Sequence, residues 1–227
     1  MLIISIIIPM LNEAEYLPSC LQSLQTVRQQ GCELIVVDGS SKDDSVAIAT
    51  PLADQVLVTA RGRAKQMNAG ARAARGDILW FLHGDSVPPA GAVDCIRTAL
   101  DKSGRDWGRF DVKLSGDWLL LRTVETLMNW RSRLSGIATG DQGIFIRRSV
   151  FLQMGGYPAL PLMEDIALSR ALKRISRPVC LRERLVTSSR RWEQKGVGRT
   201  ILLMWLLRLA YFLGVDPNRL AQIYYKG

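Results

Sequence analysis

The stretch ILWFLHGDS, from Ile78 to Ser86, is an apolar run that ends abruptly in polar residues. A short continuous apolar run is typical of a strand that is buried on both faces of a sheet. The chain's only histidine, a glycine and an aspartate come directly after it, and Gly84 allows the backbone to turn close to a ligand. The sequence therefore predicts a core strand that ends at a functional edge of a sheet.

Similar runs precede this stretch and are separated by helical patterns. They span residues 3–8, 33–38 and 55–59. Asn12 followed by Glu15 is typical of a capping box, so we predict a helix that begins at Asn12 and ends near Gly31. An alanine-rich helix is predicted at 64–74. Short apolar strands that alternate with helices indicate an α/β fold with a mainly parallel sheet covered by helices.

The second half of the chain is less regular. Strands are predicted at 110–114 and 143–146, and helices at 118–134, 149–154 and 164–174. No internal repeat or low-complexity linker is visible. We therefore predict one domain at 1–195, with a helical C-terminal extension of the same domain at 196–227.

Composition limits the classes of partner. The formal net charge of +9 over 227 residues favours anionic partners such as phosphate-bearing ligands, nucleic acid or an anionic membrane surface. The four cysteines are far apart and form no CxxC pair, which argues against a zinc cage or a disulfide framework. A reducing cytoplasm is the default location for such a chain.

Neither apolar end of the chain has the pattern of an export signal or a membrane span. MLIISIIIP lacks a basic leader and ends at Pro9, which favours a buried strand. The segment 201–214 is shorter than the roughly 20 residues that cross a bilayer, and it contains Arg208. Trp118, Trp130 and Trp205 are expected to be packing residues. The helix around 199–214 leaves open a peripheral contact with the inner face of the membrane, an intramolecular lid or a homodimer contact.

The residues after each predicted strand suggest chemistry, because ligands of an open parallel sheet bind at the carboxyl ends of its strands. These residues include Pro9, Asn12 and Glu13, then Asp38, then Arg63, then His83 and Asp85. Carboxylates can accept hydrogen bonds from a ribose or base, arginines can pair with phosphates, and an aspartate can bind a divalent ion. The first strand is followed by PMLNEAEY, so the GxGxxG dinucleotide fingerprint is missing, as is a Walker A loop. A nucleotide-sugar or related diphosphate site is the stronger interpretation.

Seven motifs in order carry a family resemblance. They are PMLNEAEYL, VVDGSSKDDS, GRAKQMNAGARAARGD, FLHGD, GDQGIFIRR, MEDIALSRAL and SSRRW. Their order resembles that of family 2 glycosyltransferases of the GT-A fold, the nucleotide-diphospho-sugar transferase fold. GRAKQMNAG and LHGD are similar to a small bacterial subgroup named for arsenosugar biosynthesis or for association with radical-SAM/selenodomain proteins.

The resemblance implies roles for particular residues. The nucleotide-sugar side would be formed by Pro9, Asn12, Glu13, Asp38, Arg63, Gln66, Asn68, His83 and Asp85. Asp165 matches the catalytic base, with Glu164 beside it. An acceptor or diphosphate group is implied for Asp141, Gln142, Arg191 and Trp192. Ser188 replaces the glutamine of the QxxRW motif of processive members, so polymer synthesis is not inferred.

Asp85 matches the last aspartate of the family's DxD motif, which binds Mg²⁺ or Mn²⁺. His83 stands where that motif has its first aspartate. The ion is therefore expected on Asp85 and the phosphates. His83 is expected to hydrogen-bond a ribose, a metal-bound water or the backbone, and direct ligation by His83 is left open as an arrangement that would favour Mn²⁺.

The function expected from these features is that of a metal-dependent, inverting, hexosyltransferase-like enzyme with a nucleotide-sugar donor, a UDP-sugar in the first place. One displacement with one base gives inversion. A nucleotidyltransferase and a polyprenyl-phosphate glycosyltransferase of the dolichyl-phosphate mannose synthase kind are the alternatives. Nucleic acid is not expected as a partner, because no aromatic RNA-binding motif or basic cluster with interleaved aromatics is present.

Overall fold

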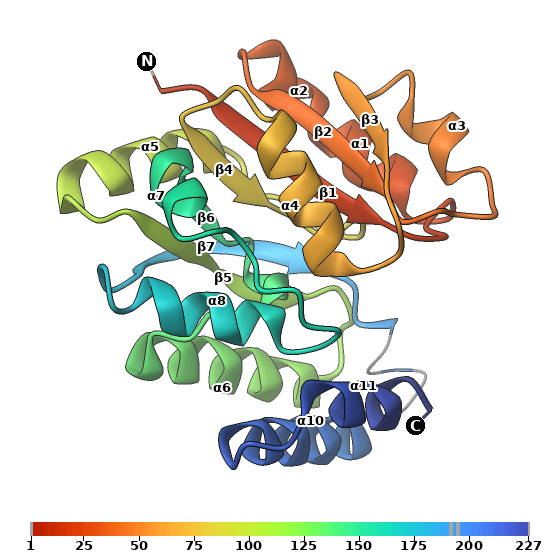
Figure 1. Ribbon diagram of the computed structural model, residues 1–227, viewed down its shortest axis with the longest axis vertical. Coiled ribbons are helices and arrows are strands. Elements are labelled where there is room, and N and C mark those ends of the chain that lie inside the picture. The colour runs from red at the N-terminus through yellow and green to blue at the C-terminus, as the bar shows by residue number, and fades with distance from the viewer. Residues whose placement is uncertain (1, 191–192, 194–195, 227) are drawn as a thin grey trace.

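The computed structural model of the protein describes residues 2–190, 193 and 196–226. Its centre is a seven-stranded sheet in the order β3-β2-β1-β4-β6-β5-β7 (Figure 1). The strands are β1 (Ile4–Met10), β2 (Glu33–Asp38), β3 (Gln55–Val58), β4 (Ile78–Phe81), β5 (Trp107–Leu114), β6 (Phe145–Arg147) and β7 (Val179–Thr187). The predicted α/β class with a mainly parallel, mixed sheet is confirmed.

One strand reverses the direction of the sheet. The pairs β1–β2, β2–β3, β1–β4 and β5–β7 are parallel, whereas β6 is antiparallel to both of its neighbours. Two successive reversals return β5 and β7 to the direction of β4. The carboxyl ends of β1, β4, β5 and β7 and the amino end of β6 therefore lie at one edge of the sheet.

Helices cover both faces of this sheet. Alternate residues of β1 separate the two layers, since Ile6 and Ile8 pack on one side and Ile7 packs on the other. The first layer includes α1 (Leu17–Ser23), α2 (Gln25–Gln29), α3 (Ser45–Ala49) and α5 (Ala92–Ser103). The second includes α4 (Arg63–Ala73), α7 (Arg148–Gln153) and α8 (Glu164–Leu172). Burial of both faces explains why β1, β2 and β4 are continuous apolar runs.

The prediction that a helix begins at Asn12 is wrong. The first helix begins at Leu17, and Asn12 has a left-handed backbone with φ of 54°. The Asn12 amide donates to Ser41 Oγ at 2.8 Å, and its Oδ1 accepts from the Lys42 N–H at 2.8 Å. Asn12 therefore joins two loops at the edge of the sheet instead of capping a helix, and Pro18 in the first turn favours the later start.

Two elements did not follow from the sequence pattern, namely α5 and β7. The last helix, α11 (Pro217–Lys226), lies in the helical extension predicted at 196–227. The expectation that three tryptophans serve as packing residues is also wrong. Trp118, Trp130 and Trp205 are 62%, 63% and 64% exposed.

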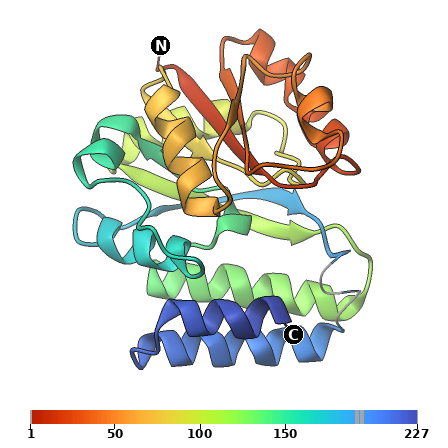
Figure 2. The same ribbon diagram turned by 45° about the vertical axis from the view of Figure 1, so that its right-hand side comes forward.

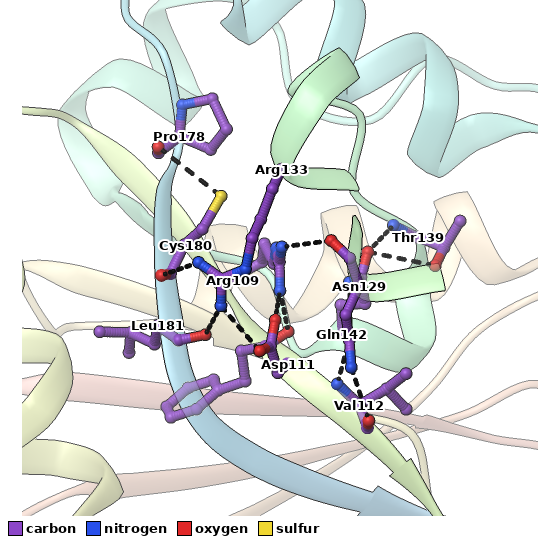
Figure 3. A network of polar contacts seen from close by, with 11 residues as sticks. Arg109, Asp111, Val112, Asn129, Arg133, Thr139, Gln142, Pro178, Cys180 and Leu181 are labelled. Carbon is purple, nitrogen blue, oxygen red and sulfur yellow. Dashed lines mark hydrogen bonds and ion pairs between the residues drawn. The ribbon is translucent and has the colours of Figure 1, made fainter. Parts of the chain in front are cut away.

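A buried polar network joins β5 to α6 (Leu119–Ser135), as Figure 3 shows. Arg109 is fully buried, pairs with Asp111, and donates to the Asn129 carbonyl at 3.1 Å. The Asn129 side chain in turn bonds both backbone groups of Val112, at 2.8 and 3.0 Å. Arg133 donates to the other Asp111 oxygen at 2.7 Å. Since the buried charges are paired, the network holds α6 in register on β5.

The C-terminal extension forms a layer beside α6, in which α10 (Val197–Phe212) and α11 lie together (Figures 1 and 2). Val197 and Ile201 near the start of α10 pack with Leu121 and Val124 of α6. Leu207, further along α10, packs with residues near α8. In the part of the chain that the structure describes, no helix is long and apolar enough to cross a membrane.

Gly108 has no room for a side chain. A Cβ built there would lie 2.4 Å from Phe145 Cζ and 2.5 Å from the Val179 carbonyl oxygen, which belong to the strands on either side of β5. Gly198 is helical, and a Cβ there meets nothing within 4 Å. We expect Gly108→Ala to lower the free energy of unfolding by ~1–3 kcal/mol. Gly198→Ala should raise it by ~0.5–1 kcal/mol, because glycine is a poor helix former. Urea denaturation of both variants checks this, and a neutral Gly108→Ala would contradict the packing of β5.

Candidate functional site

A pocket of about 310 Å³ opens at the edge where the strand ends meet. Pro9 of β1, Leu114 at the end of β5 and Thr187 at the end of β7 contribute to its wall. Eight residues that the sequence singled out also line it. They are Pro9, Glu13, Arg63, His83, Asp85, Asp141, Glu164 and Asp165. The structure thus brings together residues that are up to 156 positions apart, from Pro9 to Asp165.

Asp165 is held in the first turn of α8. One of its carboxylate oxygens, Oδ2, accepts from the Gly140 N–H at 2.9 Å, and Oδ1 accepts from the Ile166 N–H at 2.7 Å. The preceding Met163 has a left-handed backbone with φ of 68°, which is costly for a residue with a side chain. This turn directs Asp165 into the pocket, and the partial positive charge of the helix N-terminus favours a carboxylate there.

Glu164 is buried and serves a neighbouring arginine. Its Oε1 lies 3.9 Å from Arg63 Nη1, and the glutamate is 5% exposed. Burial raises the pKa of Glu164, and the adjacent Asp165 charge raises it further. The pair holds Arg63 at the start of α4, where its guanidinium faces the pocket.

His83 and Asp141 contact one another across the pocket wall. His83 Nδ1 lies 3.3 Å from Asp141 Oδ1. Burial in the pocket would raise the pKa of Asp141, but His83 and the nearby arginines outweigh this and lower it to about 2. Gly140 allows the approach, because a Cβ there would lie 2.5 Å from His83 Nε2. Asp141 is placed here by a short 3₁₀ turn, η1 (Gly140–Gln142), which leads into the reversed strand β6.

Asp85 lines the pocket with a carboxylate that is almost free of hydrogen bonds within the described residues. Its Oδ1 accepts a 3.4 Å hydrogen bond from Thr187 Oγ1, and no other hydrogen bond to its carboxylate is found among the described residues. Within the same residues, no three His, Cys, Asp or Glu side chains are grouped to hold a metal ion. A divalent ion on Asp85 would therefore need further oxygen ligands from a bound substrate. His83 offers little to such an ion, because its Nδ1 faces Asp141 and its Nε2 abuts Gly140.

A third charged pair borders Asp85. Glu13 Oε2 lies 3.8 Å from Arg190 Nη2, and the Arg190 guanidinium stacks 4.3 Å above the Tyr16 ring. Burial raises the pKa of Glu13, and Asp85 raises it further while Arg190 opposes the shift. The pocket therefore alternates carboxylates with arginines, as a site for a charged, polar ligand does.

Residues 5–151 match the family model described as glycosyl transferase family 2. The chain belongs to glycosyltransferase family 2. Two curated relatives from Mycobacterium bovis are also named as glycosyltransferases. One, an uncharacterized glycosyltransferase, is 32% identical over 134 residues, which cover 57% of this chain and 59% of the relative. The other, a PGL/p-HBAD biosynthesis glycosyltransferase, is 39% identical over 88 residues, which cover 36% of this chain and 34% of the relative.

Solved structures share the fold of this glycosyltransferase. TarS of S. aureus in complex with UDP-GlcNAc has a TM-score of 0.67 and 17% identity, covering 82% of this chain and 58% of TarS. The mannosyltransferase PcManGT of Pyrobaculum calidifontis, in complex with GDP-Man and Mn²⁺, has a TM-score of 0.59 and 19% identity, covering 81% of this chain and 56% of that one. The likeness confirms a GT-A-like α/β fold.

Several residues that the resemblance assigned to the glycosyltransferase site instead bond to the protein itself. The Gln66 amide donates to the Met10 and Val37 carbonyls at 2.7 and 2.8 Å. Asn68 bonds the backbone of Tyr157 in both directions, at 2.8 and 2.9 Å. Gln142 is fully buried and caps the Thr139 turn. These three side chains hold the loops around the pocket and do not line it.

Two other predicted residues lie beside the pocket. Asp38 is 2% exposed and accepts from the amides of Ser40 and Ser41 at 2.9 Å. Asn12 lies next to it in the paired loops. Arg191 and Trp192 fall outside the described residues.

Sequence reasoning missed part of the family 2 pocket. Arg131 of α6, Arg208 of α10 and Tyr224 of α11 line it, and Arg190 borders it. One signal was available, since Arg208 interrupts the most apolar stretch of the chain. Nothing in the sequence marks Arg131, because its place in the pocket depends on which face of α6 meets the pocket.

Proposed function

We propose that this enzyme transfers a sugar, with inversion, from a nucleoside-diphosphate donor to a hydroxyl-bearing or phosphate acceptor, with Asp165 as the base. The observation that carries the proposal is the convergence of Asp165, Arg63 and Asp85 on one pocket. It supplies a base, a cation and a metal-binding oxygen within one cavity. The complexes of TarS with UDP-GlcNAc and of PcManGT with GDP-Man support a nucleotide-sugar donor of the same class.

The donor would lie along the strand ends of the first half of the chain. Pro9, Asn12, Glu13 and Asp38 are proposed for the nucleoside. Arg63 and Arg190 are proposed for the diphosphate, because guanidinium groups pair well with phosphate oxygens. Asp85, together with diphosphate oxygens, would hold Mg²⁺ or Mn²⁺, and the ion when bound would neutralise charge on the leaving group. A UDP-sugar is the first choice of donor.

The chemistry follows from where charge develops. The acceptor oxygen forms a bond to the anomeric carbon while the bond from that carbon to the phosphate oxygen breaks. Asp165 takes the hydroxyl proton, and the nucleoside diphosphate leaves with the bonding electrons. The two backbone N–H groups on Asp165 fix its orientation before the reaction. Glu164 acts on Arg63, which it keeps in position near the leaving group.

Replacement of the base tests the mechanism. We expect Asp165→Asn to slow release of nucleoside diphosphate from the donor by ~10²–10⁴-fold, because general base catalysis contributes about that much. Nucleotide affinity should stay at the wild-type value. Asp94→Asn, an exposed aspartate outside the pocket, is the control. Full activity of Asp165→Asn would refute its assignment as the base.

Replacement of Asp85 tests the proposed ion site. We expect Asp85→Ala to bind UDP equally weakly with and without Mn²⁺, whereas the wild type gains affinity from the ion. A thermal-shift panel of UDP, GDP, TDP and CDP with Mg²⁺ or Mn²⁺ measures this, since a ligand at 100 times its dissociation constant adds ~2.7 kcal/mol of stability. Asp101→Ala, another exposed aspartate, is the control. An unchanged metal titration in Asp85→Ala would place the ion elsewhere.

Three finer points belong to the proposal: the acceptor, an alternative reaction and the subgroup within the family. A polyprenyl-phosphate acceptor, of the kind used by dolichyl-phosphate mannose synthase, fits a pocket with both arginines and apolar walls. A nucleotidyltransferase is distinguished by release of pyrophosphate in place of a nucleoside diphosphate. We propose the subgroup named for arsenosugar biosynthesis or radical-SAM/selenodomain association only as the place of this chain within family 2.

We also propose that the exposed face of α10 contacts a membrane surface peripherally. Trp205, Leu206, Leu209 and Phe212 are each more than half exposed, and the chain is strongly basic.

Vesicle co-sedimentation tests this contact. We expect binding to vesicles of phosphatidylcholine with phosphatidylglycerol, and weaker binding in high salt or to phosphatidylcholine alone. The double variant Leu206→Ser with Leu209→Ser should stay in the supernatant. If the wild type also stays there and shows a dimer mass that this variant loses, the face serves self-association and the membrane proposal is wrong.

A further inference from the structure

Helices α6 and α10 present matching stripes to the pocket. On α6 the stripe is Val124, Leu127, Met128 and Arg131, and on α10 it is Ile201, Met204, Trp205 and Arg208. Both have the spacing i, i+3, i+4, i+7, which places the four side chains on one face of a helix. Both helices begin at the same end of the molecule, where Val124 packs near Ile201. Each stripe therefore starts apolar and ends in an arginine at the same end of the pocket.

Three guanidinium nitrogens of these arginines are buried and unpaired within the described residues. Arg131 Nε and Nη2 and Arg208 Nε donate to no hydrogen-bond acceptor there. No ion pair within 4.0 Å reaches either guanidinium in the same part of the chain. The carboxylates nearby are already occupied. Asp165 accepts two backbone N–H groups, and Asp141 contacts His83.

This arrangement is unfavourable in the free protein. Burial and the like charge of Arg208 together lower the pKa of Arg131 to about 10, although Asp165 and Asp141 oppose the shift. The pKa of Arg208 is also lowered, chiefly by burial, although Asp165 and Asp141 oppose this. A largely buried cation without a bonded partner costs free energy, so two of them in one pocket are expected where a ligand supplies the missing anion.

The wall next to the arginines is apolar. Leu127 and Met128 of α6 and Met204 and Trp205 of α10 line the pocket next to the arginines on the same helices. Leu127 and Trp205 are 47% and 64% exposed, so this wall continues to the surface. A ligand that places an anion on the arginines would therefore have apolar surface along its remaining length.

We propose that Arg131 and Arg208 bind the anionic group of the acceptor, a phosphate monoester carried on an apolar chain. The inference rests on the proposed glycosyl transfer and names its acceptor class. The anion would lie in the same pocket as Asp165, so the oxygen that receives the sugar is on the phosphate or close to it. The donor diphosphate would lie on the other side, near Asp85 and Arg190.

Binding without any nucleotide tests the proposal, so that a negative result leaves the donor prediction untouched. The probes are farnesyl phosphate, which has both features, farnesol, which has only the chain, and glycerol 3-phosphate, which has only the phosphate. Isothermal titration below the aggregation concentration of the lipid is expected to rank farnesyl phosphate at least 10-fold above either of the others, since hydrogen bonds to charged groups are each worth roughly that factor or more.

Paired variants locate the anion. We expect Arg131→Met with Arg208→Met to weaken farnesyl phosphate binding by roughly 100-fold while farnesol and UDP binding stay within about twofold, because methionine keeps the apolar stem and removes the charge. Arg182→Gln, an exposed arginine outside the pocket, should change none of these affinities. The free double variant should also melt at a higher temperature than the wild type, because it lacks two unpaired buried cations.

Four outcomes would overturn the proposal. Equal binding of farnesol and farnesyl phosphate would show that no anion is recognised. Equal binding of glycerol 3-phosphate and farnesyl phosphate would show a site for soluble phosphates with no apolar part. A loss of UDP affinity above about 10-fold in the double variant would assign the arginines to the donor, and a lower melting temperature with unchanged ligand binding would make them structural.

Discussion

The site depends on the direction of one short strand. Because β6 runs against its neighbours, the turn η1 that precedes it arrives at the same edge as the carboxyl ends of β1, β4 and β7. This places Asp141 against His83 and places the Gly140 N–H against Asp165. If β6 were parallel, its preceding turn would be at the opposite edge. Asp141 in η1 and Asp165 would then lie at opposite edges of the sheet.

The polar network under α6 makes this arrangement rigid. The side chain of Asn129 on α6 accepts a hydrogen bond from the Val112 N–H of β5. The Gln142 side-chain amide donates to the same oxygen, Asn129 Oδ1, at 3.5 Å (Figure 3). Gln142 in turn caps the Thr139 turn from which Asp141 projects. The same helix carries Arg131 into the pocket. Interactions that are wholly buried and structural therefore determine where the exposed, charged groups of the pocket lie.

Charge in the pocket is divided unevenly. Glu164 with Arg63 and Glu13 with Arg190 are pairs, and Asp141 has His83. Within the part of the chain that the structure describes, Arg131 and Arg208 have no such partner, and Asp85 has only Thr187. The unpaired groups are the ones that a ligand can satisfy, and they have opposite sign. A donor with its ion on one side and an anionic acceptor on the other would complete both sets of interactions.

The individual helices and strands illustrate what local pattern can and cannot predict. β1, β2 and β4 were evident because strands buried on both faces are continuous apolar runs. The helix expected at Asn12 failed because its side chain is used by a loop 30 residues away, which no local rule includes. The tryptophans were expected to pack, yet Trp130 and Trp205 stay exposed because α6 and α10 have no further layer over them within the described chain. Gln66 and Asn68 were expected at a ligand, but each bonds backbone that only folding brings near.

The sequence by itself determined the α/β class, and the order of seven motifs indicated the family. Asp85 could be predicted because it comes directly after a strand, where chain direction places it at an edge, whereas Asp165 was assigned by the resemblance of its motif. Only the tertiary structure decided which of them meet, that η1 belongs to the same edge, and that Arg131 and Arg208 face the pocket without ion-pair partners among the described residues. The reason is physical: pairing and burial of a charge depend on neighbours distant in the chain, which the reversal of β6 and the docking of α10 on α6 supply.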